Sequence, residues 1–179
     1  GSMRGINDSR GKLFYDYVNL IKAKQPLFFL AENVAGILSP KHRSEFMKIV
    51  NAFREIGYNV TFKLLDVQDY GVPQERKRVI IVGYHEKMGK TFSFPLPLNK
   101  KLTLRDAISD LPEPFSANHK NKTNGTTLKV TNHEYMNGGF STIYMSRNRV
   151  RGWDEPSFTI QAGGRHAPCH PQAPKMKFV

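Results

Sequence analysis

Two short segments of the sequence carry side chains that could act on a bound ligand, and Glu32-Asn33-Val34 is the first. It directly follows the apolar run Leu27–Ala31, which has the composition of a buried strand. Ligands of open α/β sheets bind at the carboxyl ends of strands, where a carboxylate can accept a hydrogen bond from an amine or protonated ring nitrogen of a base. The alternative is a strand-end glutamate that faces solvent or caps the next helix, and these three residues alone favour that alternative.

The second segment runs from Asp69 to Arg78 and leads into the apolar residues 79–83. If the segment is extended, side-chain alternation places Arg76 and Arg78 on one face and Lys77 on the other. Two neighbouring guanidinium groups can bind phosphate oxygens or a carbonyl group. The alternative is a solvated basic strand edge that discourages aggregation.

Alternating helices and strands must position both segments. Apolar residues recur at three- and four-residue spacing in two stretches, which predicts amphipathic helices. The apolar run before Glu32 is expected to form a strand that is buried on both faces. The order predicts an α/β fold with part of a doubly wound sheet, from which strands are missing. The expected elements are helices over 12–21 and from Ser39-Pro40 to Gly57, and strands over 27–31, 59–65 and 79–83.

The second half of the chain, beyond residues 94–97, is predicted to be irregular, β-rich and basic. A short helix is expected over Leu104–Asp110, and β-like runs over 141–145 and 157–161 are separated by glycine pairs. This half is either a DNA-facing module or a set of long loops. The net charge of +12 and the pI near 9.9 indicate a polyanionic partner, nucleic acid before membrane.

Composition excludes several classes of protein. The single cysteine, Cys169, excludes an internal disulfide framework and a Cys-based zinc cluster, and it is typical of a reducing compartment. His166 and His170 flank Cys169 without a fourth ligand, so no metal site is predicted. No apolar run is long enough to cross a bilayer, and the sequence has no signal-peptide pattern.

In their order along the chain, three segments together resemble consecutive motifs of the cytosine-C5 DNA methyltransferase family. They are Asp8-Ser9-Arg10-Gly11-Lys12-Leu13-Phe14, then Glu32-Asn33-Val34, then Tyr70-Gly71-Val72-Pro73-Gln74 with Arg76 and Arg78. The resemblance is close over residues 4–84 and looser through 104–112 and 153–162. Each motif is weak singly, whereas their ordered combination is specific.

The resemblance implies methyl transfer from S-adenosylmethionine to C5 of a cytosine flipped out of duplex DNA, after a cysteine thiolate adds to C6. Glu32 would hold the base edge at N3 and N4, Arg78 would bind O2, and Arg76 would bind the adjoining backbone. Asn33 and Gln74 would brace the loops by hydrogen bonds.

The same resemblance implies that this chain is a fragment. Family members carry a Gly-rich cofactor loop and a Pro-Cys-Gln nucleophile loop upstream of the segment that matches residues 8–14, and an Arg-rich helix motif and a Gly-Asn motif at the C-terminal end. We expect the C-terminal part of a catalytic domain over 4–85 and a target-recognition region, complete or incomplete, over 86–179. Leu13 would line the adenine pocket of the cofactor, with a plain core role as the alternative.

The chain alone is expected to be inactive, because its one cysteine does not match the nucleophile loop. Cys169 lies downstream of Glu32, in Pro168-Cys169-His170, and lacks the following glutamine. An ordinary loop thiol is the favoured interpretation of this residue.

The target-recognition region supplies the expected DNA contacts. Glycines permit close backbone approach, glutamine and arginine read adenine and guanine edges, and other arginines meet phosphates. Trp153 is expected in the core, and a merely solvated loop is the alternative for the whole stretch. The candidates are Thr159, Gln161, Gly163, Gly164 and Arg165 in one loop, and Arg147, Arg149 and Arg151 at phosphates.

The partners implied are S-adenosylmethionine as cofactor and duplex DNA as substrate. A complementary N-terminal methyltransferase polypeptide would complete the active site, and an exposed sheet edge could pair two copies in a dimer. The expected setting is restriction-modification in a bacterial cytoplasm. Two rival interpretations are a separate DNA-recognition subunit of a split methyltransferase and a relative that modifies RNA; the long region after Arg78 favours DNA.

Overall fold

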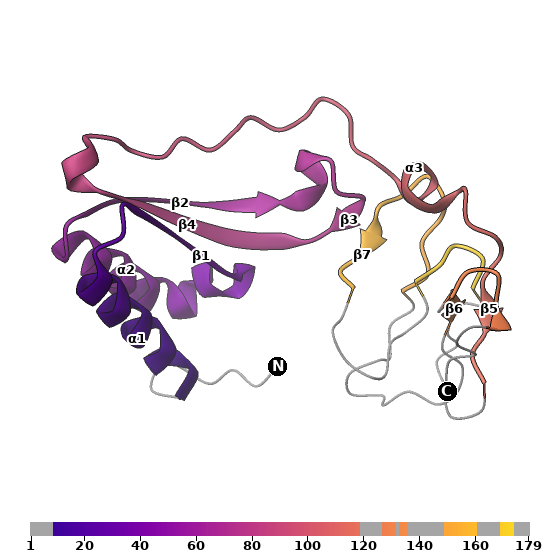
Figure 1. Ribbon diagram of the computed structural model, residues 1–179, viewed down its shortest axis with the longest axis horizontal. Coiled ribbons are helices and arrows are strands. Elements are labelled where there is room, and N and C mark those ends of the chain that lie inside the picture. Colours follow the sequence, from indigo (N-terminus) through magenta and orange to yellow (C-terminus); the bar gives the residue numbers. More distant parts are fainter. Residues whose placement is uncertain (1–8, 119–126, 132, 136–148, 161–168, 174–179) are drawn as a thin grey trace. The chain divides into compact units, whose positions relative to one another are not determined.

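The structure is a computed structural model that describes residues 9–118, 127–131, 133–135, 149–160 and 169–173 (Figure 1). The chain forms two compact units, and each is described by itself. The first unit comprises residues 1–65 and 77–96, and the second comprises residues 66–76 and 97–179.

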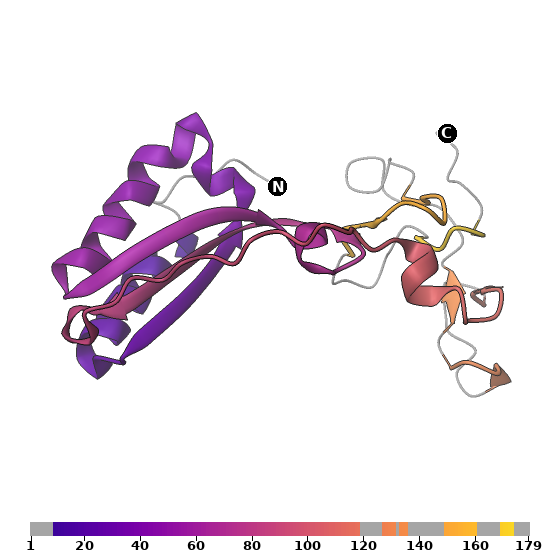
Figure 2. The same ribbon diagram turned by 90° about the horizontal axis from the view of Figure 1, so that it is seen from above.

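The first unit is a three-stranded sheet with two helices on one face (Figures 1 and 2). The strand order is β1-β4-β2, so β4 is central, and β1 pairs with it antiparallel. These elements confirm the α/β fold class. Their bounds are α1 Ser9–Lys24, β1 Phe28–Val34, the 3₁₀ turn η1 Ala35–Leu38, α2 Pro40–Glu55, β2 Tyr58–Asp66, β4 Lys77–His85 and the 3₁₀ turn η3 Glu86–Met88.

The core lies between the helices and one face of the sheet. The apolar stripe of α2, formed by Phe46, Ile49, Val50 and Phe53, is fully buried, as its spacing predicts. It packs with residues of α1 and with alternate residues of the three strands. At the β1–β4 contact the ring of Phe29 lies where a Cβ of residue 83 would be, so any side chain larger than that of glycine would have to displace this ring.

Both ends of α2 lie close to the residues that the sequence predicts, Ser39 and Gly57. Ser39 takes the N-cap position of α2, and its carbonyl accepts hydrogen bonds from His42 and Arg43 at 2.9 Å each, but its side chain makes no capping bond. Gly57 follows the helix with φ of +92°, a conformation that favours glycine.

The expectation that the strand before Glu32 is buried on both faces is wrong. Phe29 is 3% exposed, whereas its neighbours Phe28 and Leu30 are 60% and 57% exposed. The reason is that β1 lies at the sheet edge and the helices cover only the face of Phe29. The opposite face is partly covered elsewhere, because the ring of Phe92 packs 6.2 Å from that of Tyr84 on β4.

In the part of the second unit that the structure describes, the helices and strands are short. Two parallel two-stranded pairs are present there, β3 with β7 and β5 with β6. Thr103 and Asp106 form a capping box at the start of α3, which ends two residues before the predicted Asp110. The predicted run 141–145 lies outside the described residues. The elements are the 3₁₀ turn η2 Val67–Tyr70, β3 Gln74–Glu75, α3 Leu104–Ile108, β5 Phe115–Ser116, β6 Glu134–Tyr135 and β7 Ser157–Phe158.

None of the helices in the described part of the chain is long and apolar enough to span a membrane.

Candidate functional site

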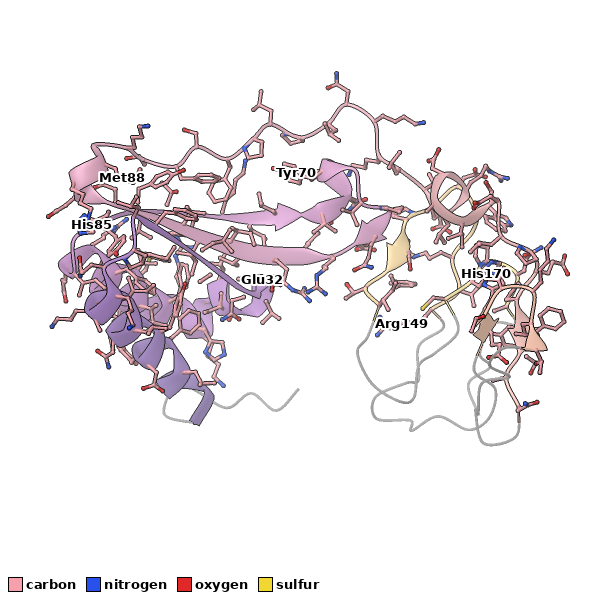
Figure 3. The ribbon with its side chains drawn as sticks, in the orientation of Figure 1. Glu32, Tyr70, His85, Met88, Arg149 and His170 are labelled. Atoms are coloured by element: carbon pink, nitrogen blue, oxygen red, sulfur yellow. The ribbon has the colours of Figure 1, made fainter. Side chains whose placement is uncertain are left out.

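The pairing of β1 with β4 brings Glu32 and Arg78 together within the first unit. In the antiparallel register Glu32 lies opposite Ile80 and Arg78 lies opposite Val34, so the two side chains are diagonal neighbours on the face that the helices leave uncovered. Arg78 Nε lies 2.7 Å from Glu32 Oε1, and Arg78 Nη1 donates to the carbonyl of Lys77 at 2.8 Å. Figure 3 labels Glu32 toward the end of β1.

This arrangement presents a carboxylate and a guanidinium side by side at a partly open surface. The Glu32 side chain is 46% exposed and that of Arg78 is 19% exposed. A carboxylate accepts hydrogen bonds and a guanidinium donates up to five. A planar ligand with amino, ring-nitrogen and carbonyl groups on one edge would find complementary partners in such a pair.

Arg76 belongs to the second unit, whereas Glu32 and Arg78 belong to the first. It lies between β3 and β4, so the predicted extended segment through Arg76 and Arg78 is interrupted. Its N–H donates to Asp66 Oδ1 at 3.3 Å and its carbonyl accepts from Val67 N at 3.0 Å. These bonds close the loop 66–76 on itself, with Gly71 at φ of +79° ending η2.

Three further residues were predicted to support the site, namely Asn33, Gln74 and Leu13. Asn33 Oδ1 accepts from the N–H of the next residue, Val34, at 2.8 Å. Gln74 pairs with Ser157 in the β3–β7 ladder. Leu13 is 64% exposed on α1, which contradicts the core role that was its alternative.

Among the expected DNA-contacting residues, Arg149, Arg151 and Thr159 are described. Arg147, Gln161, Gly163, Gly164 and Arg165 lie outside the described residues. The guanidinium carbon of Arg149 lies 5.6 Å from the ring centroid of Phe158. Thr159 Oγ1 donates to the carbonyl of Glu75 at 2.7 Å.

Arg151 lies between two carboxylates. Its Nη2 is 2.6 Å from Glu75 Oε2 and its Nη1 is 3.2 Å from Glu155 Oε1. Sequence reasoning missed both partners. The four-residue spacing of Arg151 and Glu155 is a usable signal for the second pair, but nothing in the sequence links Arg151 to Glu75.

Cys169 is partly buried, and the adjacent His170 lies among aromatic rings of the second unit. Burial raises the pKa of the Cys169 thiol, although the charge of Arg149 acts in the opposite direction. Burial and the neighbouring His133 lower the pKa of His170, whose ring lies 5.4 Å from those of His133 and Trp153. Trp153 is half-buried in place of the expected core position.

Within the described ranges, no three His, Cys, Asp or Glu side chains are close enough to hold a metal ion; His166 lies outside these ranges. A raised thiol pKa also means that little nucleophilic thiolate is present at neutral pH.

The sequence profile described as C-5 cytosine-specific DNA methylase matches residues 1–178. The type II methyltransferase M.MthTI of Methanothermobacter thermautotrophicus is 68% identical over 98% of this chain and 53% of its own length. The type II methyltransferase M.FnuDI of Fusobacterium nucleatum is 51% identical over 98% of this chain and 52% of its own. This chain thus spans about half the length of these relatives.

A solved structure is also similar. It is described as a DNA modification methyltransferase encoded within a prophage (E. coli), and it matches with a TM-score of 0.55 at 32% identity, over 62% of this chain and 33% of its own.

Proposed function

The chain belongs to the C-5 cytosine-specific DNA methylase family, and on that premise we propose that it forms part of an enzyme that methylates C5 of a flipped cytosine in a specific duplex sequence. The observation that carries this proposal is the contact of Glu32 with Arg78 on neighbouring strands. Glu32 and the two arginines of the 76–78 segment are the residues that the family resemblance assigns to the target base and its backbone.

In this proposal, Glu32 accepts hydrogen bonds from N4 and a protonated N3 of the cytosine. Arg78 donates to O2, where negative charge develops as a nucleophile adds to C6, and Arg76 binds the adjoining backbone. Both base contacts draw electron density away from C6. Asn33 keeps the end of β1 in place for this contact through its bond to Val34 N.

S-adenosylmethionine would supply the methyl group. The exposed side chain of Leu13 on α1 fits one apolar wall of an adenine pocket. We assign this chain no other cofactor contact.

We further propose that this chain transfers no methyl group by itself. Cys169 is its one cysteine, and burial holds its pKa high, so it does not fit the role of an activated thiolate. A second polypeptide that carries the nucleophile and the rest of the cofactor pocket would complete the site.

The outer edge of β1 suits such a partner. The N–H of His85 bonds to the carbonyl of Leu27, so residues 27, 29, 31 and 33 direct their backbone groups toward β4 and the residues between them direct theirs outward. The outward carbonyl of Leu30 accepts a bond from Tyr17 Oη at 3.1 Å. The side chains of Phe28, Leu30 and Val34 are exposed on the sheet face beside this edge. A second strand or a second copy could pair with the backbone groups of the edge and pack its own side chains beside these three.

Transfer of labelled methyl groups from S-adenosylmethionine to mixed-sequence duplex DNA tests the proposal. The chain is assayed alone and mixed with a separately expressed polypeptide that matches the other half of the relatives. Transfer in the mixture alone is the expected result. Transfer by this chain alone would contradict the split site, and no transfer in either case together with no DNA binding would contradict the function.

A further inference from the structure

Two segments of the second unit that are far apart in sequence are joined by hydrogen bonds to the backbone of residues 73–75. In the parallel pair of β3 with β7, Gln74 lies beside Ser157 and Glu75 beside Phe158. The N–H of Ser157 donates to the carbonyl of Pro73 at 2.9 Å, and Thr159 Oγ1 donates to the carbonyl of Glu75 at 2.7 Å. A pair of two-residue strands is only marginally stable by itself, so side-chain contacts must stabilise the connection between the two segments.

Arg151 supplies that side-chain link. Its guanidinium carbon lies 3.8 Å from the ring centroid of Phe158, and its side chain is 22% exposed. Nη2 contacts Glu75 at 2.6 Å, across 76 residues of sequence. Among the described residues Nε is buried and has no hydrogen-bond partner. A stacked, shielded guanidinium with a charge-assisted bond is fixed in one orientation.

We propose that Arg151 is a positioning residue, which through Glu75 fixes the segment that carries Arg76 to the segment that is expected to face DNA. This inference rests on the proposed function, and it gives Arg151 a role through another residue in place of a phosphate contact. We call Arg151, Glu75 and Thr159 the clasp.

The clasp affects the position of Arg76, because Glu75 directly precedes Arg76 in the chain. Both ends of the loop 66–76 are bonded to each other through Arg76, whose N–H bonds to Asp66 and whose carbonyl bonds to Val67 N. The clasp adds an external anchor at Glu75, through its side chain and its carbonyl. Without that anchor the loop could shift as a body, and displacements of about 1 Å near a reacting group can lower a rate by about 100-fold.

Glu155 offers a matched control, because it contacts the same guanidinium from within the 149–160 segment. In the reconstituted enzyme, the Glu75→Ala variant should lower the single-turnover methyl-transfer rate about tenfold or more, with the Kd for duplex DNA within about twofold of wild type. The Glu155→Ala variant should leave the rate within about twofold. The Glu75→Ala/Arg151→Ala double variant should be no slower than Arg151→Ala alone, since both changes break the same contact.

Equal rate losses in Glu75→Ala and Glu155→Ala, or losses that add in the double variant, would overturn the clasp. So would a loss in Kd that matches the loss in rate, because the residue would then act in DNA binding.

A second measurement separates this inference from the proposed function. Hydrogen exchange of the Ser157 and Val67 amides is followed in the 179-residue chain without DNA. Glu75→Ala should raise exchange at both amides, whereas Glu155→Ala should raise it less. If the wild-type mixture transfers no methyl group, the proposed function fails while this exchange result still decides the clasp; unchanged exchange in Glu75→Ala would overturn it.

Discussion

Glu32 is the residue whose chemistry can be separated most cleanly from the fold, because it lies on the sheet face opposite the helices. In the reconstituted enzyme, Glu32→Gln should lower the methyl-transfer rate about 100-fold and change the Kd for duplex DNA far less. The amide oxygen can still accept a hydrogen bond, but it carries no negative charge to stabilise a protonated N3 as the carboxylate does. Rapid-quench kinetics and fluorescence anisotropy measure the two quantities.

Glu45→Gln is the matched control for this change. Glu45 also forms a 2.7 Å ion pair, with Lys48 on the exposed side of α2, and should leave both quantities unchanged. Equal losses of rate and affinity in Glu32→Gln would mean that Glu32 is structural.

His170 makes the stability of the folded chain depend on pH. Its pKa is lowered in the folded chain by burial and by His133, so the unfolded state binds protons more readily as the pH falls below about 6.5. The stability due to neutral His170 is therefore fully present above that value and is lost as the pH falls toward the folded pKa. As the pH is lowered from 7.5 to 5, the Tm of His170→Phe should fall less than the Tm of the wild type.

Phenylalanine keeps an aromatic ring beside Trp153 and removes the titrating group. Identical curves for His170→Phe and wild type would rule out this histidine as the source.

At the scale of elements, the β1–β4 contact depends on the absence of a side chain at position 83. Gly83→Ala would drive a methyl group into the Phe29 ring, and it should lower the free energy of unfolding by about 1–3 kcal/mol. Gly36→Ala is the control, because a Cβ there meets nothing within 4 Å. Urea unfolding followed by circular dichroism measures both; similar midpoints for the two variants would contradict this account of the sheet.

The same elements show what the sequence could predict. The spacing of apolar residues, together with the prolines and glycines that end helices and strands, predicted the positions of α1, α2, β1, β2 and β4, because these signals are local. The burial of β1 was predicted wrongly, since an apolar run does not reveal which of its faces has a neighbour. The family resemblance assigns Glu32 and Arg78 to one base, and it is the pairing of β1 with β4 in the structure that brings the two side chains together. The tie of Arg151 to Glu75 could not be predicted, because a contact across 76 residues leaves no local pattern.

At the scale of the whole molecule, the exposed edge of β1 predicts association. Apolar side chains and outward backbone groups along one strand favour pairing with another chain, so the protein alone should form dimers or larger species in light scattering. Adding the complementary polypeptide should convert these to a one-to-one complex, because both partners compete for the same strand. Leu30→Lys should weaken both forms of association, since burial of a lysine at this strand is unfavourable.

Leu20→Lys is the matched control for the edge, because Leu20 is a similarly exposed leucine on α1. It should leave the light-scattering mass and the yield of the mixed complex unchanged. If Leu30→Lys lowers self-association but not assembly with the second polypeptide, the two partners use different surfaces, and the partner must dock elsewhere than on β1. If the wild-type chain is strictly monomeric at high concentration while the mixed complex still forms, the edge is specific for the second polypeptide, and the charge of +12 is then sufficient to keep like chains apart.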